Sequence, residues 1–325
     1  MKVSVLICTR NRVQSIIQCL DSIDAAARAA SLTDAEIVVT DNASEDDTFS
    51  VVQRWAATSS LPVRLEYEPR AGITIAKNRG LRSASGEILV LTDDDCRLRS
   101  DYFMELLRMH ADDTTPALRG GRVELGDKSD LELTIKTDTI ARCWDLGSRS
   151  AKYENLGNCF LGCNLFMTRQ VYERLGPFDE NFGVDGRIPA GEDTEYIFRA
   201  YTAGLKIEYA PNIVVFHHHG RKTPVDAWRL WRNYMTGSGG LYAKYLFRHP
   251  SLCGQVRWDV RGLAREILTR QNLFLPQYEF SYADKFRCYI RGASLYLLAV
   301  MKNLVSAASI DKAVSNTSAA TRHKL

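Results

Sequence analysis

Short apolar runs alternate with amphipathic segments over about the first 95 residues of the chain. Four runs have the length and composition of buried strands, and between them apolar residues recur every three or four positions, as on one face of a helix. The expected strands are 3–8, 36–40, 63–66 and 88–91, and the expected helices are 13–23, 49–55 and 72–84. This order predicts an α/β fold with a Rossmann-like, mostly parallel central sheet flanked by helices.

Beyond residue 100 the pattern is less regular. The expected elements are a helix at 131–144, a bent buried strand at 159–168, a helix from Gly191 to Gly204, and strands at 206–209 and 213–216. Ser44, with Asp47 three residues later, resembles a capping box for the helix at 49–55. Aromatic, basic helices dominate from residue 221. We therefore predict a domain at 1–220, with halves 1–100 and 101–220, and a helical C-terminal extension at 221–325.

Polar residues follow the carboxyl ends of the expected strands, where ligands bind in open parallel sheets. Three consecutive carboxylates, Asp93, Asp94 and Asp95, follow the fourth strand. Adjacent carboxylates repel one another unless a cation neutralises them, and oxygen ligands of this kind suit Mg²⁺ or Mn²⁺. The triplet therefore indicates a metal and phosphate site. A solvated turn or an acidic helix N-terminus is the alternative interpretation.

Charge is segregated along the chain. Residues 220–325 contain 17 Lys and Arg against six Asp and Glu, whereas residues 1–219 contain 25 against 33. A basic end of this kind suits an anionic partner such as lipid headgroups, and no nucleic-acid-reading pattern accompanies it. The basic helices could therefore contact an anionic membrane. Alternatively, their apolar faces pack on the rest of the protein.

The eight cysteines show no CxxC pair and no zinc-ligand spacing, which is typical of reduced core thiols. The chain starts with a strand pattern, without the apolar segment of a signal peptide. The longest apolar run near the C-terminus, 293–301, is shorter than the roughly 20 residues that span a bilayer. We therefore expect a cytoplasmic protein, with peripheral contact to the inner membrane face left open.

Eight short motifs occur in the order found in family 2 glycosyltransferases, and the chain resembles that family over residues 1 to about 220. They are VSVLICTRNR at 3–12, DNAS at 41–44, AKNRG at 76–80, DDD at 93–95, GCN at 162–164, FDE at 178–180, GED at 191–193 and the histidines from His217. The resemblance implies a GT-A fold and a metal-dependent, inverting transfer from a nucleotide sugar.

The resemblance also implies metal and nucleotide ligands. The DxD frame of the family falls on Asp93, near the ribose, and Asp95, on the metal, although it could slip onto Asp94. His217 would approach the metal or the diphosphate, since adjacent histidines on a strand cannot all converge; a histidine without a ligand is the alternative. The remaining nucleotide-binding candidates are Thr9, Asn11, Arg12, Asp41, Lys77, Asn78 and Asp94. For these residues, turn or loop polarity is the alternative.

For the acceptor, the resemblance implies Asp193 as the general base, with Glu192 as its rival. Both acids could instead stabilise a helix N-terminus through the helix dipole. Asn164 and Asp179 are expected to shape the acceptor pocket, with purely structural roles as the alternative.

We thus expect an inverting glycosyltransferase that uses a nucleotide sugar, preferably a UDP-sugar, in cell-surface polysaccharide or glycan synthesis. Its acceptor would be a hydroxyl of a saccharide or of a lipid-linked saccharide. A nucleotidyltransferase acting on sugar phosphates would share the sheet and the acidic site but would release pyrophosphate. A non-catalytic nucleotide-sugar-binding module would bind the donor without turnover.

Overall fold

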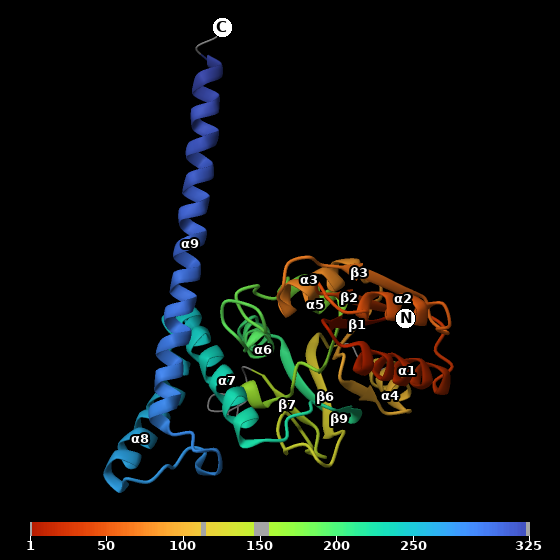
Figure 1. Cartoon of the computed structure of the whole chain (residues 1–325), viewed down its shortest axis with the longest axis horizontal. Coiled ribbons are helices and arrows are strands. Elements are labelled where there is room, and N and C mark those ends of the chain that lie inside the picture. The colour runs from red at the N-terminus through yellow and green to blue at the C-terminus, as the bar shows by residue number, and fades with distance from the viewer. Residues whose placement is uncertain (1, 112–114, 146–155, 323–325) are drawn as a thin grey trace.

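A nine-stranded mixed sheet runs through the body of the protein (Figure 1). The computed structural model describes residues 2–111, 115–145 and 156–322, and the side chains of these except residues 156 and 303–322. The strand order is β3-β2-β1-β4-β8-β6-β9-β5, with β7 paired to β9. The strands are β1 (Val3–Thr9), β2 (Ala35–Asp41), β3 (Val63–Tyr67), β4 (Ile88–Asp93), β5 (Cys96–Leu98), β6 (Ala117–Leu125), β7 (Arg142–Trp144), β8 (Asn164–Thr168) and β9 (Lys206–His217).

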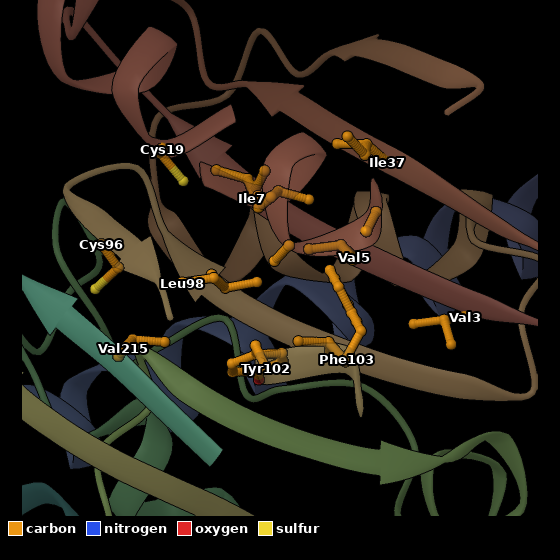
Figure 2. Packing of buried hydrophobic residues seen from close by; sticks show 14 of the residues in the cluster. Val3, Val5, Ile7, Cys19, Ile37, Cys96, Leu98, Tyr102, Phe103 and Val215 are labelled. Carbon is orange, nitrogen blue, oxygen red and sulfur yellow. The ribbon is translucent and has the colours of Figure 1, made fainter. Parts of the chain in front are cut away.

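Helices cover both faces of this sheet. In chain order they are α1 (Val13–Ala29), α2 (Thr48–Ala56), α3 (Ile73–Ser83), α4 (Tyr102–Ala111), α5 (Arg169–Leu175) and α6 (Glu192–Thr202). Alternate residues of β1 point to opposite faces of the sheet. Val5 and Ile7 pack in a core with α1, α2 and α4 on one face. Leu6 packs in a second core with α3, α5 and α6 on the other face. Figure 2 shows part of the first core, including Val5, Ile7 and Phe103.

The first half of the sheet confirms the predicted parallel arrangement. β1 pairs in parallel with β2 on one side and with β4 on the other, and β2 pairs in parallel with β3. The register sets Thr9 opposite Asp41 and Cys8 opposite Asp93. The polar residues at three strand ends therefore meet at one edge of the sheet.

The second half departs from the predicted parallel order. β8 is antiparallel to both β4 and β6, and β5 and β7 are antiparallel to β9. The two strands expected at 206–209 and 213–216 are one strand, β9, which pairs in parallel with β6 across a register shift after Gly121. The sheet is therefore mixed: its parallel pairs are those among the first four strands and the pair of β6 with β9.

Two local predictions are wrong. The helix expected at 131–144 is an extended segment, because Lys136 exchanges both backbone hydrogen bonds with Val123 and the segment ends as β7. The capping box is also absent: α2 begins at Thr48, and the Ser44 hydroxyl instead accepts a hydrogen bond from the Asn11 N–H at 3.0 Å. In both cases a tertiary partner overrides the local sequence pattern.

Three helices follow the sheet: α7 (Pro224–Tyr245), α8 (Cys253–Thr269) and α9 (Tyr282–Arg322). α7 packs along α9, and α9 continues away from the body of the protein (Figure 1). α8 is joined to α9 by Asp259, which lies 2.7 Å from Lys285 Nζ and accepts a hydrogen bond from the Tyr289 hydroxyl at 2.8 Å. Among the described residues, no helix is both long and apolar enough to cross a membrane.

Candidate active site

A cavity of about 330 Å³ lies at the carboxyl edge of the parallel strands. Thr9 at the end of β1, Asp93 at the end of β4 and His217 at the end of β9 line it. Lys77 from α3 and Asp193 from α6 complete its charged wall. The fold thus brings together residues that are far apart in the sequence, as expected for a site at the carboxyl ends of strands.

Asp93, Asp95 and His217 form a compact group of metal-binding type. One donor atom from each lies within 4.8 Å of the other two, and His217 Nε2 is 3.3 Å from Asp95 Oδ1. The pairing of Cys96 with His217 across β5 and β9 brings these side chains together. Two carboxylates and an imidazole are donors that suit Mn²⁺ or Mg²⁺, so these three residues would hold such an ion.

A backbone carbonyl oxygen on the side away from the carboxylates orients the His217 ring. Its Nδ1 lies 3.1 Å from the Thr134 carbonyl oxygen, which can only accept, so Nδ1 carries a proton whether the ring is neutral or charged, and Nε2 faces the carboxylates. Thr134 has φ of 49°, which is strained for a β-branched residue. Burial opposes a charged ring, but the Cys163 sulfur and the carboxylates of Asp95 and Asp93 outweigh it and raise the pKa of His217 to about 10.

Asp94 faces a different partner. Its Oδ2 accepts a hydrogen bond from the Thr9 hydroxyl at 2.7 Å, and burial raises its pKa to about 7. Asp94 is not part of the group formed by Asp93, Asp95 and His217. The geometry therefore favours Asp93 and Asp95 over a frame that includes Asp94. The half-exposed guanidinium of Arg12 lies 3.9 Å from Asp94 and 4.0 Å from Asp95, at the mouth of the cavity.

Asp193 and Glu192 open α6 at the cavity wall. The Gly162 N–H donates to Asp193 Oδ2 at 3.1 Å and the Thr194 N–H donates to Oδ1 at 2.6 Å. Burial and the neighbouring Glu192 raise the pKa of Asp193, and Lys77 only partly opposes them. A side chain at position 162 would meet Asp193 Cβ at 2.9 Å, so glycine permits this close approach.

Lys77 is buried between the two halves of the site. Its ammonium lies 3.3 Å from Glu192 Oε1. Burial alone would lower the pKa of Lys77, but Glu192, Asp93 and Asp193 outweigh burial and hold it above its ordinary value. Lys77 therefore stays charged and couples the metal-binding group to the acids of α6.

Nine of the predicted residues line the cavity. They are Thr9, Arg12, Lys77, Asp93, Asp94, Asp95, Glu192, Asp193 and His217. Five others do not line it, and each binds neighbouring protein groups. They are Asn11, Asp41, Asn78, Asn164 and Asp179.

Three of these five belong to the nucleotide half and bind loop backbone groups. Asn11 Oδ1 accepts from the Glu45 N–H at 2.8 Å, and Asp41 Oδ1 accepts from the Ser44 N–H at 2.9 Å, closing an Asx-type turn. Asn78 binds both backbone groups of Phe178, donating at 3.0 Å and accepting at 2.8 Å. The structure places these side chains in support of the loops.

The two residues expected at the acceptor also bind protein groups. The Asn164 amide donates to the Arg122 and Ile213 carbonyl oxygens and accepts from the Tyr102 hydroxyl, so its capacity is used inside the sheet. Asp179 pairs with Lys244 at 2.7 Å and borders a separate hollow. Neither side chain reaches the cavity that Asp193 lines.

The sequence did not point to the part of the wall formed by the C-terminal helices. Arg221 precedes α7, and Leu230, Asn233 and Tyr234 lie three or four residues apart on one face of α7. Only this helical spacing could have identified them as a group. The cavity therefore takes residues from both sides of position 220, whereas the proposed domain division remains a prediction.

Residues 4–176 match the model of the family described as Glycosyl transferase family 2. The match covers more than half of the chain. The chain belongs to this family. Glycosyltransferase AglE of Haloferax volcanii is 27% identical over 218 residues, covering 66% of each chain. A glucosyl-dolichyl phosphate glucuronosyltransferase from the same organism is 22% identical, covering 73% of this chain and 75% of that protein. The chain spans only 33% of the length of two animal relatives.

Solved structures resemble this glycosyltransferase in fold. The mannosyltransferase PcManGT of Pyrobaculum calidifontis, in complex with GDP-Man and Mn²⁺, has a TM-score of 0.56 at 20% identity, over 95% of this chain and 80% of that chain. TarS of S. aureus in complex with UDP-GlcNAc has a TM-score of 0.51 at 16% identity, over 77% of this chain and 72% of that chain. The predicted GT-A fold and glycosyltransferase class are confirmed, and the nucleotidyltransferase and the non-catalytic module are not supported.

Proposed function

We propose that this family 2 enzyme transfers a sugar from a nucleoside diphosphate donor to an acceptor hydroxyl, with inversion at the anomeric carbon. One observation carries the proposal: Asp193, a partly buried carboxylate outside the metal-binding group, lines the same cavity as Asp93, Asp95 and His217. A single displacement needs both functions in one cavity, because charge develops on the leaving group while the attacking hydroxyl loses its proton.

The donor side is formed by β1, β4 and β9. Asp93, Asp95 and His217 would hold Mg²⁺ or Mn²⁺, and such an ion neutralises the negative charge on a departing diphosphate. Lys77 and Arg12 add positive charge to the same wall. We propose a UDP-sugar as donor, which is supported by the UDP-GlcNAc bound to TarS, although PcManGT holds GDP-Man.

The acceptor side is formed by α6 and α7. Asp193 would take the proton of the attacking hydroxyl, and the N–H groups of Gly162 and Thr194 fix the orientation of its carboxylate. Asn233 and Tyr234 offer polar groups on the α7 wall that suit a sugar. We propose a saccharide or lipid-linked saccharide acceptor and a role in glycan or cell-surface polysaccharide synthesis. The name of the dolichyl phosphate relative supports a lipid-linked acceptor.

We also propose that the enzyme works in the cytoplasm with α8 and α9 resting on the anionic inner face of a membrane. Trp258 on α8 is 64% exposed and Leu268 is 82% exposed, and Arg257 and Arg261 on α8 are exposed beside them. Apolar and cationic side chains on one helix suit an interface between headgroups and lipid chains.

Asp193→Asn tests the base. We expect donor binding to stay within about threefold of wild type while transfer falls by roughly 10²–10⁴-fold, the usual contribution of a general base. Donor affinity is measured by calorimetry and transfer by release of nucleoside diphosphate. Glu173→Gln on the exposed face of α5 serves as the control. Full transfer activity in Asp193→Asn would refute the assignment, and loss of activity only in Glu192→Gln would transfer it to Glu192.

The reaction class is tested with a set of nucleotide sugars, with and without a chelator. We expect release of nucleoside diphosphate that stops with chelator and returns with Mn²⁺ or Mg²⁺, and a product whose anomeric configuration is opposite to that of the donor by NMR. Release of pyrophosphate, or retention of configuration, would contradict the proposed reaction.

A further inference from the structure

Two buried thiols lie against the ring of His217. Cys96 directly follows Asp95 and pairs with His217 across β5 and β9, and Cys163 directly precedes β8. One donor atom from each of Cys96, Cys163 and His217 lies within 4.8 Å of the other two. Their exposed fractions are 0%, 5% and 6%. This second group shares His217 with Asp93 and Asp95 but has sulfur donors in place of oxygen.

The donor set suits a soft divalent cation. Two cysteine sulfurs and one histidine nitrogen are a common zinc ligand set, which leaves a fourth position for another ligand. With Zn–S near 2.3 Å and Zn–N near 2.0 Å, tetrahedral ligands stand roughly 3.5–3.8 Å apart, so side-chain movements of about 1 Å close the site. Cys163 and His217 line the cavity, and an ion can reach them from there.

Oxidation of Cys96 and Cys163 to a disulfide is the alternative reaction of these thiols. Both disulfide formation and metal binding need deprotonated sulfur, so the burial of Cys96 opposes both reactions. The carboxylates of Asp93 and Asp95 beside His217 attract a positive ion, which supports metal binding.

His217 can serve only one ion at a time. Its Nδ1–H points to the Thr134 carbonyl oxygen, so Nε2 carries the single lone pair that can bind a metal. An ion on the two sulfurs and Nε2 would withdraw His217 from Asp95. The two groups of donors are therefore alternatives.

We propose that Cys96, Cys163 and His217 form a second metal site, which takes Zn²⁺ or another thiophilic divalent cation and thereby inhibits the enzyme. Binding at this site depends only on the donor set. The inhibition rests on the proposed function, because it requires His217 to take part in metal-assisted transfer.

The binding test uses the full chain, stripped of metal, with Co²⁺ as a spectroscopic probe. We expect a thiolate-to-cobalt charge-transfer band in the near ultraviolet and its displacement by Zn²⁺. Cys96→Ala and Cys163→Ala are expected to lose the band and to weaken Zn²⁺ binding by at least about tenfold. Cys96→Ser and Cys163→Ser keep the side-chain size, and circular dichroism checks that each variant is folded.

Two further variants are the controls. Cys159→Ala removes a buried thiol outside the group, and Cys8→Ala removes another thiol that lines the cavity. Both are expected to keep the band. No band in the wild type, or a band that survives in folded Cys96 and Cys163 variants and disappears in Cys8→Ala, would overturn the site.

The inhibition test compares each variant with itself, with and without Zn²⁺, at several Mn²⁺ concentrations. We expect inhibition of wild-type transfer that added Mn²⁺ relieves, and at least about tenfold weaker inhibition in the Cys96 and Cys163 variants. Inhibition that Mn²⁺ does not relieve would refute competition for His217. If the enzyme proved to catalyse another reaction, the cobalt band would be unchanged, so failure of the proposed function is distinguishable from failure of the site.

Discussion

At the scale of single residues, the site depends on a row of charges that runs from Lys77 through Glu192 to Asp193. The Lys77 ammonium contacts Glu192, and Glu192 acts in turn on Asp193. A general base works best when its pKa is near the working pH, so a carboxylate with a raised pKa is a better base than an ordinary aspartate. In the proposed mechanism Glu192 would thus raise the pKa of Asp193 without having to contact the acceptor.

Glu192→Gln is expected to lower the pKa of Asp193. The substitution removes a neighbouring negative charge and leaves Lys77 free to stabilise the Asp193 carboxylate, and both changes favour the deprotonated base. If Asp193 is the base, as proposed, transfer needs its deprotonated form, and activity is lost as pH falls through its pKa. The acidic limb of kcat/KM should therefore move to lower pH by roughly 0.5–1 unit. A limb that moves to higher pH would contradict this coupling; Glu173→Gln provides the matched control.

Position at the end of an apolar run was sufficient to place Asp93, Asp94 and Asp95 at the cavity, whereas Lys77, Asp193 and His217 were expected from the resemblance to family 2 glycosyltransferases. The sequence also suggested Asn78 and Asn164, whose amides bind protein groups instead. An amide beside a strand or loop can bind either a ligand or the protein backbone, and only the fold decides which. The backbone groups of Phe178 and Ile213, which satisfy these amides, lie far away in the sequence.

The Asn78 amide can be tested at the scale of elements, since it ties α3 to the loop before α6. Asn78→Ala would leave both backbone groups of Phe178 without their buried partner, at a cost of about 2–4 kcal/mol in the free energy of unfolding. Donor KM should stay within about twofold. Chemical denaturation and steady-state kinetics measure the two effects, with the exposed Gln53→Ala as control. Unchanged stability with a large rise in donor KM would restore the predicted nucleotide contact.

Glycines set how closely α7 approaches its neighbours. A side chain at Gly237 would meet the Ala190 carbonyl oxygen at 2.7 Å, just before the acids of α6. On the face of α7 toward α9, a side chain at Gly239 would meet the Tyr289 carbonyl oxygen at 2.2 Å. The absence of side chains at these positions brings the wall of Leu230, Asn233 and Tyr234 against the start of α6.

Gly237→Ala should therefore separate α7 from α6. We expect a loss of about 1–3 kcal/mol in the free energy of unfolding from overpacking, and a rise in acceptor KM that exceeds the rise in donor KM. Gly254→Ala in α8 is the matched control, because nothing lies within 4 Å of the added Cβ. Because alanine favours a helix more than glycine does, Gly254→Ala should raise the free energy of unfolding by about 0.5–1 kcal/mol. Equal effects of both substitutions on acceptor KM would show that the contact of α7 with α6 is unimportant for the acceptor.

The strands and helices of the first half could be predicted because each amphipathic period was long and regular. The segment at 131–144 could not, because its extended form depends on hydrogen bonds to Val123 and on the pairing of β7 with β9. The antiparallel position of β8 had no local signal either, since a short buried run gives no direction. The part of the fold that sequence missed is therefore the part determined by long-range pairing.

At the scale of the whole molecule, the distribution of charge and the arrangement of the C-terminal helices both favour a membrane as the partner of these helices. The acidic body contains the cavity, and the basic residues concentrate in α7, α8 and α9, which stand to one side of the sheet (Figure 1). The exposed apolar residues of α8 and α9 include Trp258, Leu268, Ile290 and Leu297. A basic surface repels a second copy of itself and attracts anionic lipid, so a membrane is the better partner for it.

Vesicle binding tests this orientation. The full chain is expected to sediment with vesicles rich in anionic lipid, to bind neutral vesicles weakly, and to dissociate as salt is raised. Each basic residue near such a surface contributes about 1 kcal/mol, so reversing Arg257 and Arg261 to Glu should weaken binding by at least roughly 25-fold. Arg82 is an exposed residue of α3, and Arg82→Glu is the control that should bind as wild type. Binding of the double variant to anionic vesicles as tight as that of wild type, or a stable dimer whose contact Trp258→Ala disrupts in the absence of lipid, would assign this surface to another partner.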